Sequence, residues 1–232
     1  MAREFDRNMF VMLFAIMIGA IVITYFAADL IGSGKIQDLT SQYEGEISSV
    51  KSENENFTSS FIKSTVILDQ AREDRAFGNY HFDLGLIWYQ SALAERNITY
   101  FKQYKQRGID NCTNAMPKYY YSHLNFDDSK EYFNQTIAFA SKNYLEVLDL
   151  YVKLTESGAK LTTLRYDASR YLLYLIENLT WDPINNNATF LENVSEIMVL
   201  FAGVMAEYQA EIGNYEDIQD EIDEYEFFEE IR

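Results

Sequence analysis

Seven asparagines stand in the motif Asn-X-Ser/Thr, the acceptor for N-linked glycans, and six of these motifs end in threonine. Chance predicts about two such motifs for a chain of this composition. A bias toward asparagine and threonine is the competing explanation, but the excess favours a chain that is glycosylated outside the cytoplasm. The acceptors are Asn56, Asn97, Asn111, Asn134, Asn178, Asn187 and Asn193.

The residue types most used in catalysis are scarce. His81 and His123 are the only histidines, and neither stands in a metal-binding spacing such as His-Glu-x-x-His. Cys112 is the only cysteine, so an internal disulfide is excluded while an intermolecular one stays open. Because Cys112 lies inside the motif of Asn111, we expect its thiol in an exposed loop. The sequence also lacks a phosphate-binding glycine loop and a nucleophile elbow. We therefore predict that the chain is not an enzyme and that it has no catalytic residue, metal site or cofactor.

Acidic residues dominate the charge. The chain has 36 acidic and 19 basic residues and a net charge of −17, which argues against nucleic acid as a partner. No pair of carboxylates stands out as an acid–base pair for glycoside hydrolysis. The acidic run at 216–230 lacks the spacing of a calcium loop. We expect a solvated helix face there; a docking face for a basic partner or a diffuse cation site is the alternative.

Three consecutive tyrosines, Tyr119, Tyr120 and Tyr121, are the best candidates for a contact site. Successive residues of a helix point about 100° apart, so the three side chains cannot all face a core. We expect at least one of them to be exposed and to contact a sugar or a protein.

An apolar segment at residues 9–31 is expected to position the rest of the chain. It holds no charged side chain before Asp29. Its length fits a transmembrane helix, which needs about 20 apolar residues, and exceeds the apolar core of a signal peptide, about 7 to 15 residues. Small residues at helical spacing predict close packing against another helix in the lipid. They are Ala15, Gly19, Ala20, Thr24 and Ala28.

The predicted organisation has five parts. They are a cytoplasmic tail at 1–8, the membrane anchor at 9–31, a hinge at 32–35, an extracytoplasmic helical bundle at 36–213 and an acidic C-terminal helix at 214–232. Arg3 and Arg7 before the anchor and Lys35 after it give a weak positive-inside bias, and the glycosylation motifs reinforce that orientation. We thus predict a single-pass protein of the cell membrane. Its disulfide-free, acidic, glycan-rich body is typical of an archaeal surface.

The body is predicted to be all-α, because apolar residues recur three and four apart and strand-like alternation is hard to find. Helices are expected at 36–76, 79–107, 126–156, 160–179 and 189–213, before the acidic final helix. The first is either a coiled-coil stalk or part of the bundle. Gly108, Gly158 and Gly213 are expected to end helices. Residues 109–117 are expected to form a connector, 118–125 a short helix or turn, and 181–187 a loop, with a capping box at Thr189 and Glu192.

Residues 121–140 resemble the second half of a tetratricopeptide repeat, with Phe126, Phe133 and Phe139 in its aromatic or apolar positions. The body is accordingly a bundle or a stack of helical hairpins, although no period of about 34 residues recurs.

These features predict a non-catalytic structural or interaction subunit of a membrane or surface assembly. Its partners would be membrane lipid and either another membrane or surface protein or a second copy of the chain. One alternative is a ligand-binding or sensory module that needs a signalling partner, since bundles can hold pockets between helices. Another is a surface filament subunit, because archaeal pilins are similar in their apolar N-terminal helix and glycosylation motifs. The residues before the anchor, however, contain no Lys/Arg-Gly processing site.

Overall fold

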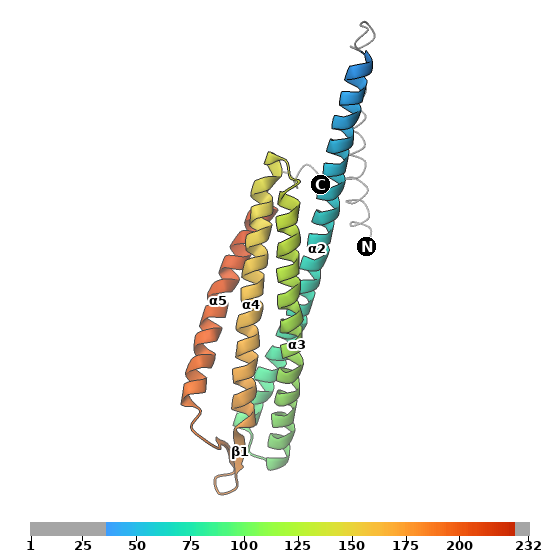
Figure 1. Cartoon of the computed structure of the whole chain (residues 1–232). Helices are drawn as coiled ribbons and strands as arrows, with labels where there is room; N and C mark the ends of the chain where they lie inside the picture. Colours follow the sequence, from blue (N-terminus) through green and yellow to red (C-terminus); the bar gives the residue numbers. More distant parts are fainter. Residues whose placement is uncertain (1–35, 226–232) are drawn as a thin grey trace. The chain divides into compact units, whose positions relative to one another are not determined.

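The computed structural model describes residues 36–225, with side-chain exposure given from residue 45. In this range the helices are α2 (Ile36–Ala94), α3 (Ile98–Ile137), α4 (Leu145–Glu177) and α5 (Ser195–Asp223), with a 3-10 turn η1 (Lys142–Tyr144). Two short strands, β1 (Leu179–Asp182) and β2 (Asn187–Phe190), join α4 to α5 (Figure 1). The prediction of an all-α helical bundle is confirmed.

The described chain divides into two units. Residues 57–222 form one compact unit, the bundle, while residues 36–56 and 223–225 belong to the other. Side chains at 45–56 are exposed, including Ile47 and Val50. From Phe57 onward the apolar stripe of α2 is packed, with Phe57 5.3 Å from Tyr144 and Phe61 5.8 Å from Tyr151 between ring centres. The bundle interpretation of this helix therefore holds from Phe57 on.

No helix within residues 36–225 is both long and apolar enough to cross a bilayer. The predicted tail, anchor and hinge, with the small residues of the anchor, lie outside the described residues, as does the end of the acidic helix at 226–232.

The core of the bundle is built by α2, α3 and α4, which approach closely at glycines. A Cβ on Gly85 would lie 2.8 Å from the sulfur of Cys112, and one on Gly108 would lie 3.0 Å from Ile176 Cδ1. A Cβ on Gly158 would lie 2.3 Å from the buried Phe126 ring. Gly108 and Gly158 therefore permit helix contact inside α3 and α4, and the prediction that they end helices is wrong.

The boundary between the first two helices of the bundle lies elsewhere than predicted. Helix α2 runs on through residues 76–79 to Ala94, and Asn97 caps α3, its side chain accepting hydrogen bonds from the amides of Thr99 and Tyr100. The expected connector at 109–117 and turn at 118–125 are interior parts of α3. Pro117 is tolerated because it faces solvent, where water can satisfy the carbonyl that loses its partner.

The predicted third and fourth helices, at 126–156 and 160–179, are also redrawn. The chain turns at 138–141, and α4 begins at Leu145 and continues through Gly158 to Glu177. Helix α3 alone has 40 residues, more than a whole tetratricopeptide repeat of about 34. The helices are thus too long for that repeat fold.

The expected loop at 181–187 is a β-hairpin, and the expected capping box is wrong. Leu179 pairs with Phe190 and Asp182 with Asn187, in antiparallel register. Its turn contains Asn186 at φ 49°, a conformation that asparagine tolerates well. Thr189 lies in β2, while Asn193 Oδ1 accepts a hydrogen bond from the backbone amide of Ser195 at the start of α5. Helix α5 then passes through Gly213, so no separate acidic helix begins at residue 214.

Candidate functional site

None of the seven glycosylation asparagines is buried. Four are exposed, namely Asn56, Asn97, Asn134 and Asn193, and three are half-buried, namely Asn111, Asn178 and Asn187. A glycan attached at Nδ2 of any of them would therefore begin at the surface of its unit.

Four of the motifs gather at the hairpin end of the bundle (Figure 1). Asn97 and Asn193 begin helices, Asn178 ends α4 and Asn187 opens β2. The caps at Asn97 and Asn193 use the side-chain oxygen, which leaves the nitrogen that carries a glycan available. Helix capping by itself also favours asparagine at these ends, so local structure explains part of the excess that the sequence shows.

The three tyrosines separate as their helical spacing requires. Tyr119 is fully buried, and its hydroxyl donates to Asn79 Oδ1 at 2.9 Å. Burial raises the pKa of Tyr119 far above its ordinary value, so the phenol stays protonated. Tyr120 and Tyr121 are 55% and 56% exposed, with their rings 5.7 Å apart. The expectation that at least one is exposed is confirmed, whereas their contact with a sugar or protein stays a prediction.

Cys112 lies in the core and not in an exposed loop, so that expectation is wrong. The thiol is fully buried in α3 opposite Gly85, and desolvation raises its pKa to about 12. An intermolecular disulfide through this residue is incompatible with the folded bundle. The loop prediction failed because Asn-Cys-Thr lies on a helix, where Asn111 and Thr113 point outward on either side of the buried thiol.

The histidines are half-buried at the edges of the bundle. The ring of His81 lies 3.2 Å from Asn111 Oδ1, and that of His123 lies 3.3 Å from an oxygen of Asp127. Among the described residues, no group of three or more His, Cys, Asp or Glu side chains is arranged to hold a metal ion.

Helix α5 is held to the other helices of the bundle by arginines, a role that the sequence did not predict. The Arg165 guanidinium of α4 lies 3.9 Å from the ring centre of Tyr208 and 4.4 Å from that of Phe82. The Arg75 guanidinium of α2 lies 4.4 Å from the ring centre of Tyr215. Arg165 Nε and Arg75 Nη1 are both buried without a hydrogen-bond partner. Stacking on aromatic faces offsets part of the cost of burying these cations.

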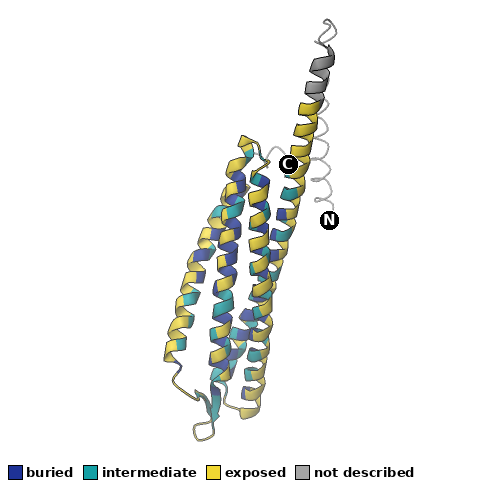
Figure 2. Cartoon of the chain, in the orientation of Figure 1, coloured by how far each residue is buried: buried dark blue, intermediate teal, exposed yellow. Residues whose placement is uncertain are grey.

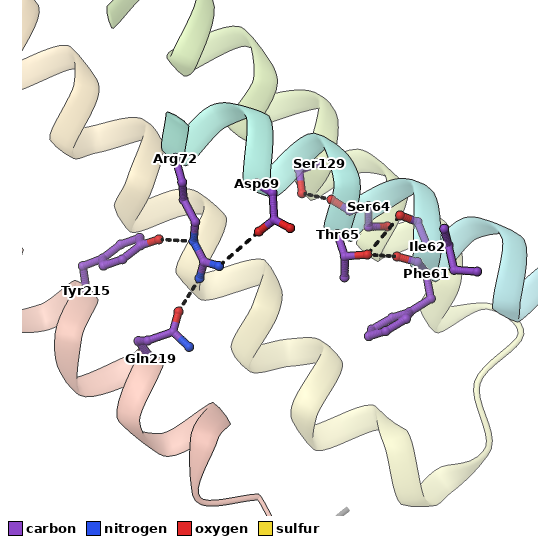
Figure 3. Close-up of polar contacts among 9 residues, drawn as sticks. All are labelled: Phe61, Ile62, Ser64, Thr65, Asp69, Arg72, Ser129, Tyr215 and Gln219. Carbon is purple, nitrogen blue, oxygen red and sulfur yellow. Dashed lines mark hydrogen bonds and ion pairs between the residues drawn. The ribbon is translucent and has the colours of Figure 1, made fainter. Parts of the chain in front are cut away.

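Arg72 adds a hydrogen-bonded contact between α2 and α5 (Figure 3). Its Nε donates to the Tyr215 hydroxyl at 2.9 Å, its Nη2 donates to Gln219, and its Nη1 lies 3.5 Å from Asp69 of its own helix. Tyr215 thus receives a hydrogen bond from one arginine and stacks against another.

Glu211 is a buried carboxylate at the contact between α5 and α4. Its oxygens accept hydrogen bonds from Ser157 at 2.5 Å, Lys160 at 2.6 Å and Asn214 at 2.9 Å. Burial alone would raise the pKa of Glu211, but these hydrogen bonds and the Lys160 charge outweigh it and lower that pKa. The carboxylate therefore stays ionised at neutral pH and joins α5 to α4.

Among the residues that the structure describes, none covers the opposite side of α5 (Figure 2). Only four α5 residues are buried, compared with ten in α3 and sixteen in α4. We call the uncovered side the outer face of α5, and its first part consists of Val199, Ala202, Gly203, Ala206, Ala210 and Gly213, all exposed. Val199 is 71% exposed. This face was not predicted from the sequence, which indicated only a helix at 189–213.

No protein-family model matches the chain, and the comparisons with curated proteins and with solved structures give no match.

Proposed function

We propose that this chain is a membrane-anchored, N-glycosylated protein of the cell surface that acts as a non-catalytic structural or interaction subunit. In this proposal residues 9–31 span the cell membrane once, the N-terminus is cytoplasmic, and the helical body lies outside. The observation that carries it is the set of seven glycosylation motifs, none of whose asparagines is buried.

Two features of the bundle support a role in contact more than in chemistry. The Cys112 sulfur faces Gly85 in the core, while His123 contacts the backbone oxygen of Ala159 and the carboxylate of Asp127. The surface, by contrast, exposes aromatic side chains at Tyr120 and Tyr121 and a long apolar face on α5. Exposed apolar surface of this kind marks sites of protein association.

Glycopeptide mapping of protein extracted from its native membrane tests the proposal. We expect sugar on several of the seven asparagines and an intact mass above the 27.1 kDa of the bare chain. Replacing Thr99 with Ala should remove the glycan at Asn97 while leaving the side-chain cap of α3 in place, which makes it a matched control for motif use. A native chain with the bare mass would contradict the proposal.

A further inference from the structure

We infer that the bundle binds a small organic dicarboxylate between α2, α4 and α5, held by the guanidinium groups of Arg75 and Arg165. The inference goes beyond the proposed function and does not depend on where the chain is located. It assigns a ligand to two side chains that also join α5 to the other helices.

Both arginines have a buried N–H group without an acceptor. Arg75 Nη1 and Arg165 Nε make no hydrogen bond to any described residue. No ion pair among the described residues includes either side chain. Buried polar groups nearly always have a partner, and a buried charge without one is costly. The oxygens of a carboxylate would supply the acceptors that the described part of the chain does not.

The aromatic rings around these cations leave their hydrogen-bonding edges available. The Arg165 guanidinium lies 3.9 Å from the ring centre of Tyr208 and 4.4 Å from that of Phe82. The Arg75 guanidinium lies 4.4 Å from the ring centre of Tyr215. A stacked ring covers the face of a guanidinium, whereas the N–H groups point outward in its plane. Each cation can therefore bind a carboxylate at its edge, and the rings provide apolar walls for the carbon chain of the ligand.

Tyr119 indicates that the two cations act on the same part of the core. Burial raises the pKa of its phenol, and the charges of Arg165 and Arg75 both act in the opposite direction. Both cations are thus close enough to one phenol to influence its ionisation. The carboxylate whose charge also acts on this phenol is that of Asp83, which is exposed. A dicarboxylate would balance the two positive charges inside the bundle.

The contact of α5 with α2 and α4 gives such a ligand its way in. Both arginine side chains are half-buried, so part of each reaches solvent. Helix α5 buries only four residues, fewer than α3 or α4. In this inference a small outward movement of α5 admits the ligand, and the bound carboxylates then hold α5 to the other helices.

Titration of the full-length chain in detergent micelles tests the inference. The probes are malonate, succinate and glutarate, which differ in the distance between their carboxylates. The matched control for each is its neutral diamide, and inorganic phosphate is the control for an oxyanion without a carbon chain. Isothermal titration calorimetry at constant ionic strength measures each dissociation constant.

We expect at least one dicarboxylate to bind about tenfold or more tightly than its diamide and than inorganic phosphate. Arg75→Gln and Arg165→Gln should each weaken that binding by about tenfold or more, because each removes charge-assisted hydrogen bonds. The matched control is Arg170→Gln, which removes an exposed cation of α4 and should leave binding unchanged.

Hydrogen exchange gives a second readout on the parent chain, independent of how well the variants fold. The dicarboxylate that binds best should slow amide exchange in α5 by a larger factor than in α3, because it holds α5 in place. Equal slowing in the two helices would contradict a site at the α5 contact.

Failure of all three dicarboxylates to bind at about 10 mM would overturn the inference. So would equal binding of a dicarboxylate and its diamide, tighter binding of inorganic phosphate, or binding that both arginine variants leave intact. The titration requires neither glycan nor cell surface. Failure of the proposed location would therefore leave its result standing, and its failure would leave the glycopeptide map unaffected.

Discussion

The guanidinium of Arg165 lies 3.9 Å from the ring centre of Tyr208, so that a cation of α4 is covered by an aromatic ring of α5. The Phe82 ring covers the same cation at 4.4 Å. Seven residues further along α5, Tyr215 covers Arg75 at 4.4 Å. The last helix of the bundle is therefore attached through arginine–tyrosine stacking at two successive levels, in addition to apolar packing.

A double-mutant cycle on this first pair measures the stacking. We expect Arg165→Met, Tyr208→Leu and the double variant to give a coupling energy of about 0.5 to 2 kcal/mol, the usual range for a cation on an aromatic face. Chemical denaturation followed by circular dichroism gives the four unfolding free energies. Strict additivity of the two single changes would show that the pair contributes no interaction of its own.

Two glycine-to-alanine substitutions are expected to change stability in opposite directions. Gly158→Ala places a Cβ 2.3 Å from the buried Phe126 ring, and we predict a loss of about 1 to 3 kcal/mol in the free energy of unfolding. A Cβ at Gly203 meets no atom of the described residues within 4 Å, and we predict a gain of up to about 1 kcal/mol. Urea denaturation of both variants beside the parent checks this, and two changes of the same sign would refute the packing described for α4.

The buried carboxylate of α5 should make stability fall in acid. Because the pKa of Glu211 is lowered in the folded protein, its stabilising contribution is complete above the ordinary pKa near 4.5. That contribution is lost as the pH falls through the lower folded pKa. Glu211→Gln removes it at every pH, so the variant should be less stable than the parent at pH 7 and the difference should shrink in acid.

Thermal unfolding from pH 7 down to about pH 3 measures this difference. Glu216→Gln, at an exposed position of the same helix, is the matched control for the loss of one carboxylate charge. A difference for Glu211→Gln that stays constant across this range would contradict the network with Ser157 and Lys160.

The single thiol should be inert in the folded protein. Cys112 is buried and its pKa is raised to about 12, so little thiolate forms at pH 8. We predict that 5,5′-dithiobis(2-nitrobenzoate) reacts only after denaturant unfolds the bundle, and that the protein runs identically with and without reductant on gels. Rapid labelling of native protein would place the thiol outside the core.

The helical character of the body was predictable, but most helix ends were not. Gly108 and Gly158 look like helix ends in the sequence, because isolated glycine lowers helix propensity. Whether such a glycine ends a helix or admits a neighbour depends on the other helix, here Ile176 and Phe126 respectively. Pro117 adds to the difficulty, since its effect depends on whether it faces solvent or core.

The candidate contact residues also differ in whether the sequence could predict them. The separation of Tyr119 from Tyr120 and Tyr121 follows from helical geometry alone and was predicted. The contact of α5 with α2 and α4 was not predicted, because Arg75 and Arg165 are polar residues whose burial depends on aromatic rings from distant parts of the chain. Sequence spacing within one helix carries no information about such partners.

The location of the body is tested most directly by labelling intact cells with a membrane-impermeant amine reagent. The account predicts that exposed lysines such as Lys102 and Lys142 are modified to the same extent before and after the cells are permeabilised, together with glycans on the same molecules. Modification that appears only after permeabilisation would place the bundle on the cytoplasmic side and contradict the account.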